Sequence, residues 1–543
     1  MERIFDKPAH KHYDIIIIGG GITGTSVAYE AASRGMKVAL FEKGDFGHAT
    51  SAATSKLIHG GLRYLKNMEF GLVRESLTER RILENIAPNF VYPLPFMIPT
   101  YSNLKNNKQI LFIGMLLYDI LSFDKAFTWD KSKKLPFHRT IGAKKTRNLE
   151  PCIKDDNLTG SSIYYDCQNI NPERFTLEML KSAMHYGAEV ANYAKVESLI
   201  KENDAIKGVK VKDLITHSKH EYTAGLTINC TGPWTDIILN ATAEKQALNH
   251  HIRRSEGIHI ITKKLCNKHA VTMMTKSGRH IMLMPWRNHS LIGTTDKEYK
   301  GNPDDYKITK ESIKELIDEL NENYGIKKLK YEDVLFAYGG LRPLVDNQTE
   351  ASYESSRKYE ITDHKKEGLD GLITVEGGKY TTSRNLAVHL VNKIANKLNK
   401  KITKSISKKK YLINSDIKNM ESFIKQLALR YPSFSEATIN YIGRNYGLQC
   451  HTIFRLALHD KSLAQILTED GEILAEVVYV IKKEMAYTLT DIFFRRTGIG
   501  TLGYPGDESF NKVVETAKDY LNWDDSKTKE EVDKVMKIFS LPQ

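Results

Sequence analysis

The sequence predicts an α/β protein followed by an all-helical C-terminal region. Residues 1–400 alternate short β-branched runs with amphipathic segments and place glycines at strand ends, which is typical of α/β domains. From about Asp416 onward, apolar residues recur at helical spacing, as in MESFIKQLALRY and ILAEVVYVIKKEMA. A lysine-rich stretch separates the two regions, so we place one domain at 1–400 and a helical domain at 411–543.

The composition is that of a globular protein with well-buried cores. The chain has 543 residues, of which 41% are hydrophobic and 27% charged, enough for two or three domains. Its first apolar run, Ile15 to Ile18, stops at glycines and therefore indicates a strand, not a signal peptide. The longest apolar stretch, 110–123, carries Asp119 and is shorter than the ~18 residues of a membrane span. We expect it to form a buried helix in preference to a membrane-dipping one.

The cysteines show no paired spacing. All five lie far apart and none belongs to a CxxC motif: Cys152, Cys167, Cys230, Cys266 and Cys450. We therefore expect no disulfide framework and no metal site, and a reducing, cytoplasmic setting.

The net charge of +13 is unevenly distributed, since residues 392–410 hold eight lysines and no acid. Such a cluster is usually a solvated linker face. The alternative is an electrostatic contact with anionic lipid or nucleic acid. No basic segment is interleaved with the aromatic residues that stack bases, so we expect no nucleic-acid partner.

Three glycines between the first strand and the first helix form a dinucleotide fingerprint. Gly19 permits the tight turn, Gly21 lets a pyrophosphate approach the backbone, and Gly24 allows the helix to pack closely on the strand. The helix N-terminus then directs amide groups at the phosphates. Glu42 ends the second strand, where a carboxylate accepts hydrogen bonds from the adenosine ribose and repels a 2′-phosphate.

The segment after Glu42 distinguishes the two common dinucleotides. An NAD domain would continue with regular βαβ units, whereas here a long loop follows, KGDFGHATSAATSKLIHGGLRYL. Its small hydroxyl residues and glycines suit a backbone lying against a large, flat, polar-edged ring system. The sequence therefore favours FAD.

This loop resembles the signature of the FAD-dependent, respiratory (aerobic-type) glycerol-3-phosphate dehydrogenases, within the amino-acid-oxidase-like flavoproteins. Further motifs follow in the order of that family and cover most of the chain: INCTGPWTD, SEGIHI, LIGTTDKEYKG, GGLRPL and VEGGKYTTSR. The helical tail also resembles the family's C-terminal domain.

The resemblance implies a Rossmann-like FAD-binding domain built from discontinuous segments, with an interleaved α+β substrate-binding domain and a C-terminal all-helical domain. It implies non-covalent FAD and oxidation of sn-glycerol 3-phosphate to dihydroxyacetone phosphate by hydride transfer. Electrons would leave to a membrane quinone. The protein would be cytoplasmic and peripherally attached to the inner face of the cell membrane, with a homo-oligomer left open.

This reaction requires cations for a phosphate, a proton acceptor near the alcohol carbon, and a donor for the developing carbonyl oxygen. By resemblance, Arg63, Tyr64 and Lys379 bind the substrate. His259 is the candidate proton acceptor, because imidazole titrates near neutral pH and nearby cations favour its basic form. Arg342 is the second candidate catalytic residue.

The candidate cofactor-binding residues fall into two groups. The fingerprint itself predicts Gly19, Gly21, Gly24 and Glu42. The resemblance adds residues of the flavin loop, of a strand that meets the adenine, and of two later glycine turns: Ser51, Ser55, Lys56, Leu57, His59, Val196, Thr231, Gly232, Gly378, Thr381 and Thr382.

Two related activities remain as alternatives. An amine- or amino-acid-oxidising flavoenzyme of this fold could use the same arginines to bind a carboxylate, although three basic residues favour a phosphate. An oxygen-using glycerol-3-phosphate oxidase of the same family usually carries an extra segment before its helical domain. Only the lysine-rich stretch stands there, which favours the dehydrogenase.

Overall fold

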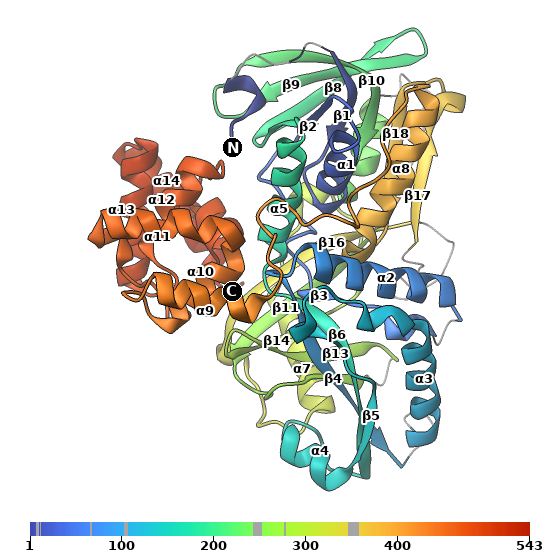
Figure 1. The fold of residues 1–543 in the computed structure, drawn as a ribbon, viewed down its shortest axis with the longest axis vertical. Coiled ribbons are helices and arrows are strands. Elements are labelled where there is room, and N and C mark those ends of the chain that lie inside the picture. Colours follow the sequence, from blue (N-terminus) through green and yellow to red (C-terminus); the bar gives the residue numbers. More distant parts are fainter. Residues whose placement is uncertain are drawn as a thin grey trace.

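The structure, a computed structural model, describes residues 1–6, 10, 12–65, 68–102, 107–242, 252–275, 278–345 and 358–543. Two sheet-containing halves lie one above the other along the long axis of the molecule, and a bundle of helices lies beside them (Figure 1). The predicted fold class, an α/β protein with a C-terminal helical domain, is confirmed.

The upper sheet has a parallel core in the order β18-β10-β1-β2-β7, with β17 antiparallel at one edge and the β8–β9 hairpin attached to β10. Ile15 and Ile17 of β1 face a helical layer, whereas Ile16 and Ile18 face the hairpin. Burial on both faces explains the uninterrupted apolar run. The strands are β1 (His12–Ile18), β2 (Val38–Phe41), β7 (Glu189–Ala191), β8 (Ala194–Glu202), β9 (Ala205–Asp213), β10 (Lys219–Asn229), β17 (Tyr359–Asp363) and β18 (Leu372–Gly377).

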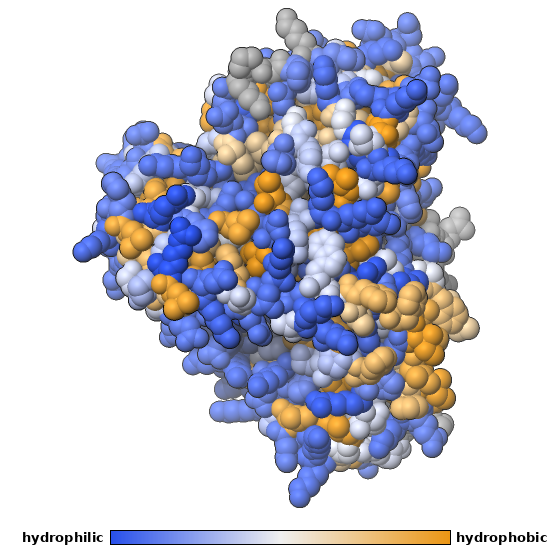
Figure 2. Space-filling model, in the orientation of Figure 1, coloured by the Kyte–Doolittle hydropathy of each residue, from blue (hydrophilic) through white to orange (hydrophobic). Residues whose placement is uncertain are grey.

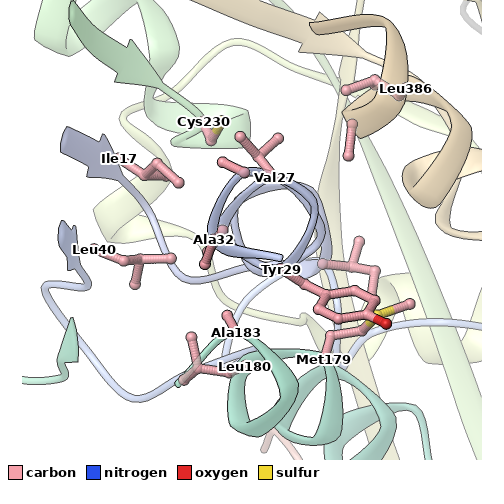
Figure 3. Packing of buried hydrophobic residues seen from close by; sticks show 14 of the residues in the cluster. Ile17, Val27, Tyr29, Ala32, Leu40, Met179, Leu180, Ala183, Cys230 and Leu386 are labelled. Carbon is pink, nitrogen blue, oxygen red and sulfur yellow. The ribbon is translucent and has the colours of Figure 1, made fainter. Parts of the chain in front are cut away.

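Helices α1 (Ile22–Ala32), α5 (Pro172–His185) and α8 (Ser383–Lys397) cover one face of this sheet. Figure 3 shows Val27 and Ala32 of α1 packed among Ile17, Leu40 and the side chains of α5. Helix α1 can come this close because a Cβ atom on Gly24 would lie 2.0 Å from the carbonyl oxygen of Gly19.

The lower sheet is built from two insertions into the upper domain. The first insertion runs from β3 to β6 between β2 and α5, and the second runs from β11 to β16 between β10 and β17. The strands are β3 (Leu57–Ile58), β4 (Val91–Tyr101), β5 (Arg139–Gly142), β6 (Leu158–Asn169), β11 (Arg253–Lys263), β12 (Ala270–Met274), β13 (His280–Trp286), β14 (His289–Gly293), β15 (Lys297–Tyr299) and β16 (Val334–Leu344). This is the interleaved arrangement that the family resemblance implied.

One face of the lower sheet packs on α7 (Lys310–Asn323), and the other face forms a core with residues of α2 (Phe70–Ile86) and α3 (Lys108–Leu121). Two short helices complete this half and its junction with the upper sheet, α4 (Ala143–Leu149) and α6 (Thr235–Thr242).

Helix α3 corrects one expectation from the sequence. The stretch 110–123 is a helix, but it is not buried: Ile110, Ile113 and Ile120 are 62%, 66% and 60% exposed. Only Met115, Tyr118 and Asp119 of this helix are buried, because the protein covers a single side of it. Within the described residues, no helix is long and apolar enough to cross a membrane.

The lysine-rich stretch continues from α8 into an extended linker that lies against the upper domain. Lys397 forms ion pairs with Asp363 and Asp370, and Lys400 pairs with Asp14. Part of the cluster is therefore neutralised by neighbouring acids. The helical domain follows, with α9 (Met420–Arg430), α10 (Glu436–Tyr446), α11 (Cys450–His459), α12 (Leu474–Lys483), a π-helix (Asp491–Thr497), α13 (Asp507–Leu521) and α14 (Asp525–Phe539).

Candidate active site

A cavity of about 1570 Å³ lies where the two sheets meet. Its walls come from the β1–α1 turn, the loop after β2, and the ends of β8, β11, β16 and β18. Most of the predicted site residues line it: Gly19, Gly21, Glu42, Ser51, Ser55, Leu57, His59, Arg63, Tyr64, Val196, Thr231, Gly232, His259, Arg342, Gly378, Lys379 and Thr381. Residues separated by more than 300 positions in the sequence thus share one chamber.

Three predicted cofactor residues do not line this cavity. Gly24 lies beneath the turn, where it sets the approach of α1 to Gly19. Lys56 has a positive φ of 56°, and its side chain forms a buried ion pair with Glu173. Thr382 is buried directly before α8. Their placement suits support of the walls and not direct contact with a ligand.

The dinucleotide end of the cavity is already ordered by hydrogen bonds within the protein. The Glu42 carboxylate accepts one from the Gly20 amide at 2.6 Å and one from the Gly44 amide at 2.7 Å. The Ser51 hydroxyl accepts another from the Ile22 amide at 2.9 Å. These hydrogen bonds join the second strand, the glycine turn and the loop after Glu42.

His259 is held as a neutral imidazole. It stacks on Tyr338 with ring centroids 5.0 Å apart, and its Nε2 lies 2.8 Å from the Ser55 hydroxyl. Burial lowers the pKa of His259 well below its usual value, and the positive charges of Arg342 and Lys56 lower it further. Among the described residues, Nδ1 of this ring is buried and has no hydrogen-bond partner.

Arg342 is positioned by residues to which the sequence assigned no role. Its Nη2 donates to the Thr294 hydroxyl at 2.7 Å, and its Nη1 donates to the Thr295 carbonyl at 3.1 Å and lies 3.6 Å from Asp296. The motif LIGTTDKEYKG contained these three residues, but only the pairing of β11 with β14, β15 and β16 places them around Arg342.

Two glycines provide the space for these two side chains. A Cβ atom on Gly257 would lie 1.9 Å from Nη2 of Arg342, and one on Gly293 would lie 2.4 Å from the His259 ring. Gly257, the glycine of the SEGIHI motif, therefore leaves room for the side chain of Arg342.

A second group of cations lies beside the flavin loop. The Lys379 ammonium is 3.8 Å from the centroid of the Tyr64 ring and donates to the Ser76 hydroxyl at 3.0 Å. The Arg63 guanidinium lies 4.8 Å from the same ring. Burial lowers the pKa of nearby His59 to about 4, opposed by Asp166 and assisted by Lys379 and Arg63. This positive, partly desolvated region is suited to an anion.

The sequence reasoning missed an apolar part of the cavity under α3. Its walls carry Phe96, Ile98, Ile110, Leu111, Gly114, Leu117, Tyr164 and Met282. Apolar periodicity in 110–123 was visible, but nothing local indicated that this helix forms one wall of the chamber.

The residues present fit a flavin dinucleotide. Gly19 has φ +104°, and a Cβ atom there would lie 2.6 Å from the carbonyl oxygen of Cys230, so the turn accepts only glycine. Gly21 is the N-cap of α1 and supplies no capping side chain, and the Ser51 hydroxyl accepts from the amide of Ile22, which leaves the other amides at the start of the helix to a phosphate. These features match the fingerprint, and the chamber extends well beyond a dinucleotide's adenosine half.

Comparisons with known proteins agree with this assignment. The chain matches the family described as FAD dependent oxidoreductase over residues 14–379, and the family described as C-terminal domain of alpha-glycerophosphate oxidase over residues 372–528. It is 33% identical to a glycerol-3-phosphate dehydrogenase of Synechocystis sp., covering 98% of this chain and 96% of the relative. It is 32% identical to the aerobic glycerol-3-phosphate dehydrogenase of Bacillus subtilis, covering 92% of this chain and 89% of the relative.

A solved structure shows the same architecture. The glycerol-3-phosphate dehydrogenase from Bacillus halodurans, complexed with FAD, matches with a TM-score of 0.77 and 25% identity over 98% of this chain and 95% of that one. Fold and site thus define an FAD-dependent oxidoreductase, and FAD is its cofactor. The chain belongs to the family of FAD-dependent glycerol-3-phosphate dehydrogenases, as the sequence motifs indicated.

We predict that Gly257→Ala lowers kcat/KM by about 10- to 100-fold, because a displacement of about 1 Å in a positioned group can cost 10²-fold. The added methyl would occupy the space of the Arg342 guanidinium. Steady-state kinetics with an artificial electron acceptor measures the change. Gly71→Ala is the control, since a Cβ atom there meets nothing within 4 Å. Equal kinetics for the two variants would contradict the role given to Gly257.

Proposed function

We propose that the protein oxidises sn-glycerol 3-phosphate to dihydroxyacetone phosphate and passes the electrons to a membrane quinone. One observation carries the proposal: a single chamber combines a dinucleotide cradle with three basic side chains and a neutral imidazole. The names of the relatives supply the substrate.

Arg63 and Lys379 bind the phosphate in this proposal. Both flank the Tyr64 ring beside the flavin loop, and burial of their surroundings strengthens their interaction with a dianion. Two positive charges match a dianionic phosphate better than a single carboxylate, which favours a phosphate over an amino acid as the ligand.

His259 and Arg342 act on the alcohol. His259 is neutral, so it can take the hydroxyl proton while the hydride leaves the carbon that bears this hydroxyl group. Arg342 donates to the oxygen as it becomes a carbonyl, from a position fixed by Thr294 and Asp296. Bound FAD supplies the two-electron acceptor for that hydride.

Helix α3 supports a quinone as the electron acceptor and a peripheral membrane attachment. Its exposed side carries Ile110, Phe112, Ile113, Leu116 and Ile120, and Phe123, Phe127 and Phe137 extend this apolar surface. We call these eight residues the α3 patch. It forms an orange area at the lower right of Figure 2, where α3 lies in Figure 1.

The same helix faces both the chamber and the outside. Leu111, Gly114 and Leu117 line the chamber, Ile110 both lines it and belongs to the α3 patch, and the other residues of the patch are exposed on the outside. Contiguous exposed apolar surface of this kind marks membrane or protein contacts. A helix lying in the cytoplasmic face of the membrane would bring the apolar part of the chamber to the lipid, where quinones dissolve. This geometry favours a quinone over oxygen, which needs no such route.

We predict that anaerobic addition of glycerol 3-phosphate bleaches the flavin absorbance of the purified protein, whereas glycerol and amino acids do not. Glycerol lacks the phosphate that Arg63 and Lys379 bind. A flavin that stays oxidised with glycerol 3-phosphate would remove the proposed substrate while leaving the FAD assignment intact. Bleaching by an amino acid would favour the alternative oxidase activity.

We predict that flavin reduction at saturating substrate is constant from pH 7 to pH 6, because the lowered pKa of His259 keeps its ring neutral in that range. Protonation, and with it the loss of rate, begins only as pH falls toward that lowered pKa. His259→Gln should slow reduction by about 10²- to 10⁴-fold and abolish the acidic limb. Stopped-flow absorbance measures both, with His289→Gln at the start of β14 as control. An unchanged profile in His259→Gln would exclude this proton acceptor.

We predict that the double variant Ile113→Asp/Ile120→Asp loses flotation with vesicles of anionic phospholipid but keeps its rate of flavin reduction by substrate. Charges in the α3 patch oppose its burial in lipid. Ile113 and Ile120 do not line the chamber, so the rate of flavin reduction should not change. Leu429→Asp, in α9, is the matched control, since Leu429 is 83% exposed outside the patch. Undiminished flotation of the double variant would remove α3 as the membrane contact.

A further inference from the structure

Asp45 connects the flavin loop to the helical domain through a buried cluster of charges. This carboxylate is 1% exposed and lies three residues after Glu42. Arg496 binds it with two hydrogen bonds of 2.7 Å, and Arg495 donates through Nε at 2.7 Å. Both arginines belong to the π-helix of the C-terminal domain.

Asp45 is charged in the folded protein. Burial alone would raise the pKa of Asp45, but Arg496 and Arg495 overcome this effect and hold the pKa at about 2. Asn192, at the end of β7, donates a further hydrogen bond of 3.0 Å to the same carboxylate. A buried charge with this many donors fixes its backbone firmly, and loss of one partner leaves an uncompensated charge.

The backbone that Asp45 fixes forms the wall of the dinucleotide site. Lys43, Gly47 and His48 line the chamber on either side of Asp45. The Gly47 amide donates to the Gly20 carbonyl at 3.0 Å, inside the glycine turn, and His48 donates its amide to the Asp45 carbonyl at 3.2 Å. The loop is thus held by Glu42 at its start and by the helical domain at Asp45.

Another charged contact between the helical domain and the remainder of the chain makes no such connection. Arg287, in the β13–β14 turn, pairs with Asp470 and Glu472 of the helical domain, and none of the three lines the chamber. Arg287 also donates to the carbonyl of Gly498, directly after the π-helix, but none of its hydrogen-bond partners lies in the loop that contains Asp45, so it offers a comparison.

We propose that the C-terminal helical domain holds the flavin loop, residues 43–65, in position through Asp45, a contact that we call the latch. Arg495 and Arg496 are then positioning residues for FAD binding. The inference rests on FAD as the cofactor and is independent of the proposed substrate. A loop that is ordered before binding costs less to order when FAD enters, so the latch appears as cofactor affinity. Because coupling is reciprocal, bound FAD also stabilises the contact of the π-helix with the loop.

The test compares Arg495→Gln/Arg496→Gln with Arg287→Gln in the full-length protein. FAD is removed, and the Kd for FAD is measured by quenching of its fluorescence on reconstitution. We expect the double variant to raise this Kd by about 5- to 150-fold, the usual range for coupled sites. Arg287→Gln should lower the melting temperature of both apo and FAD-bound protein while changing the Kd less than about 3-fold.

Hydrogen exchange distinguishes the latch from a contact that only packs the two domains together. In the wild type, FAD should slow exchange of the amides of residues 491–497, although this segment does not line the chamber. This protection should be absent in the double variant and present in Arg287→Gln. An unchanged Kd together with retained protection in the double variant would overturn the latch.

Should the double variant not fold, Arg495→Gln alone decides the question. Its side chain is 11% exposed, and the two Arg496 hydrogen bonds to Asp45 remain. A rise in Kd of more than about 3-fold would support the latch, and an unchanged Kd would contradict it.

Discussion

The close approach of α1 to the end of β1 is the constraint on which the structure of the site depends. Gly19 and Gly24 allow a contact that any side chain would prevent, and this contact fixes where the first-turn amides point. Glu42 and Ser51 then bond to the amides of Gly20 and Ile22, so the flavin loop takes its position from the same turn. Arg63, Lys379, Arg342 and His259 line the same chamber as this turn.

The protonation states of the two histidines in the chamber depend on their burial and on the cations near them. The chamber gathers Arg63, Lys379 and Arg342. Burial is the main cause that lowers the pKa of both nearby histidines; Lys379 and Arg63 assist it at His59, whose pKa is about 4, and Arg342 and Lys56 assist it at His259. A dianionic ligand relieves the repulsion among these cations. Arg63 and Lys379, which we propose bind the phosphate, are therefore distinct from Arg342 and Lys56, the cations that help to keep His259 unprotonated.

Much of this could be predicted from sequence where the signal is local. The glycine fingerprint, Glu42 and the helical periodicity after Asp416 each depend on neighbouring residues, and the structure contains the elements they predict. The surroundings of Arg342 could not be derived in this way, because Thr294 and Asp296 reach it only through strand pairing. The resemblance assigns Lys56 to the cofactor; in the structure this residue has a positive φ and its side chain pairs with Glu173. The length of the stretch 110–123 and its Asp119 predict a buried helix, but neither feature shows that the protein covers only one side of it.

The helical domain shows how a region without chamber-lining residues can still influence the chamber. Arg495 and Arg496 are adjacent in sequence, and an α-helix would separate their side chains by about 100°. Both side chains nevertheless reach Asp45 from the π-helix, a rare helix type that is frequent at functional sites. A domain that only stabilised the assembly could bind the outer faces of α5 and the β13–β14 turn, as Arg174 and Arg287 permit. Placing two buried arginines on the one acidic residue of the cofactor loop beyond Glu42 instead links the presence of this domain to the order of the FAD site.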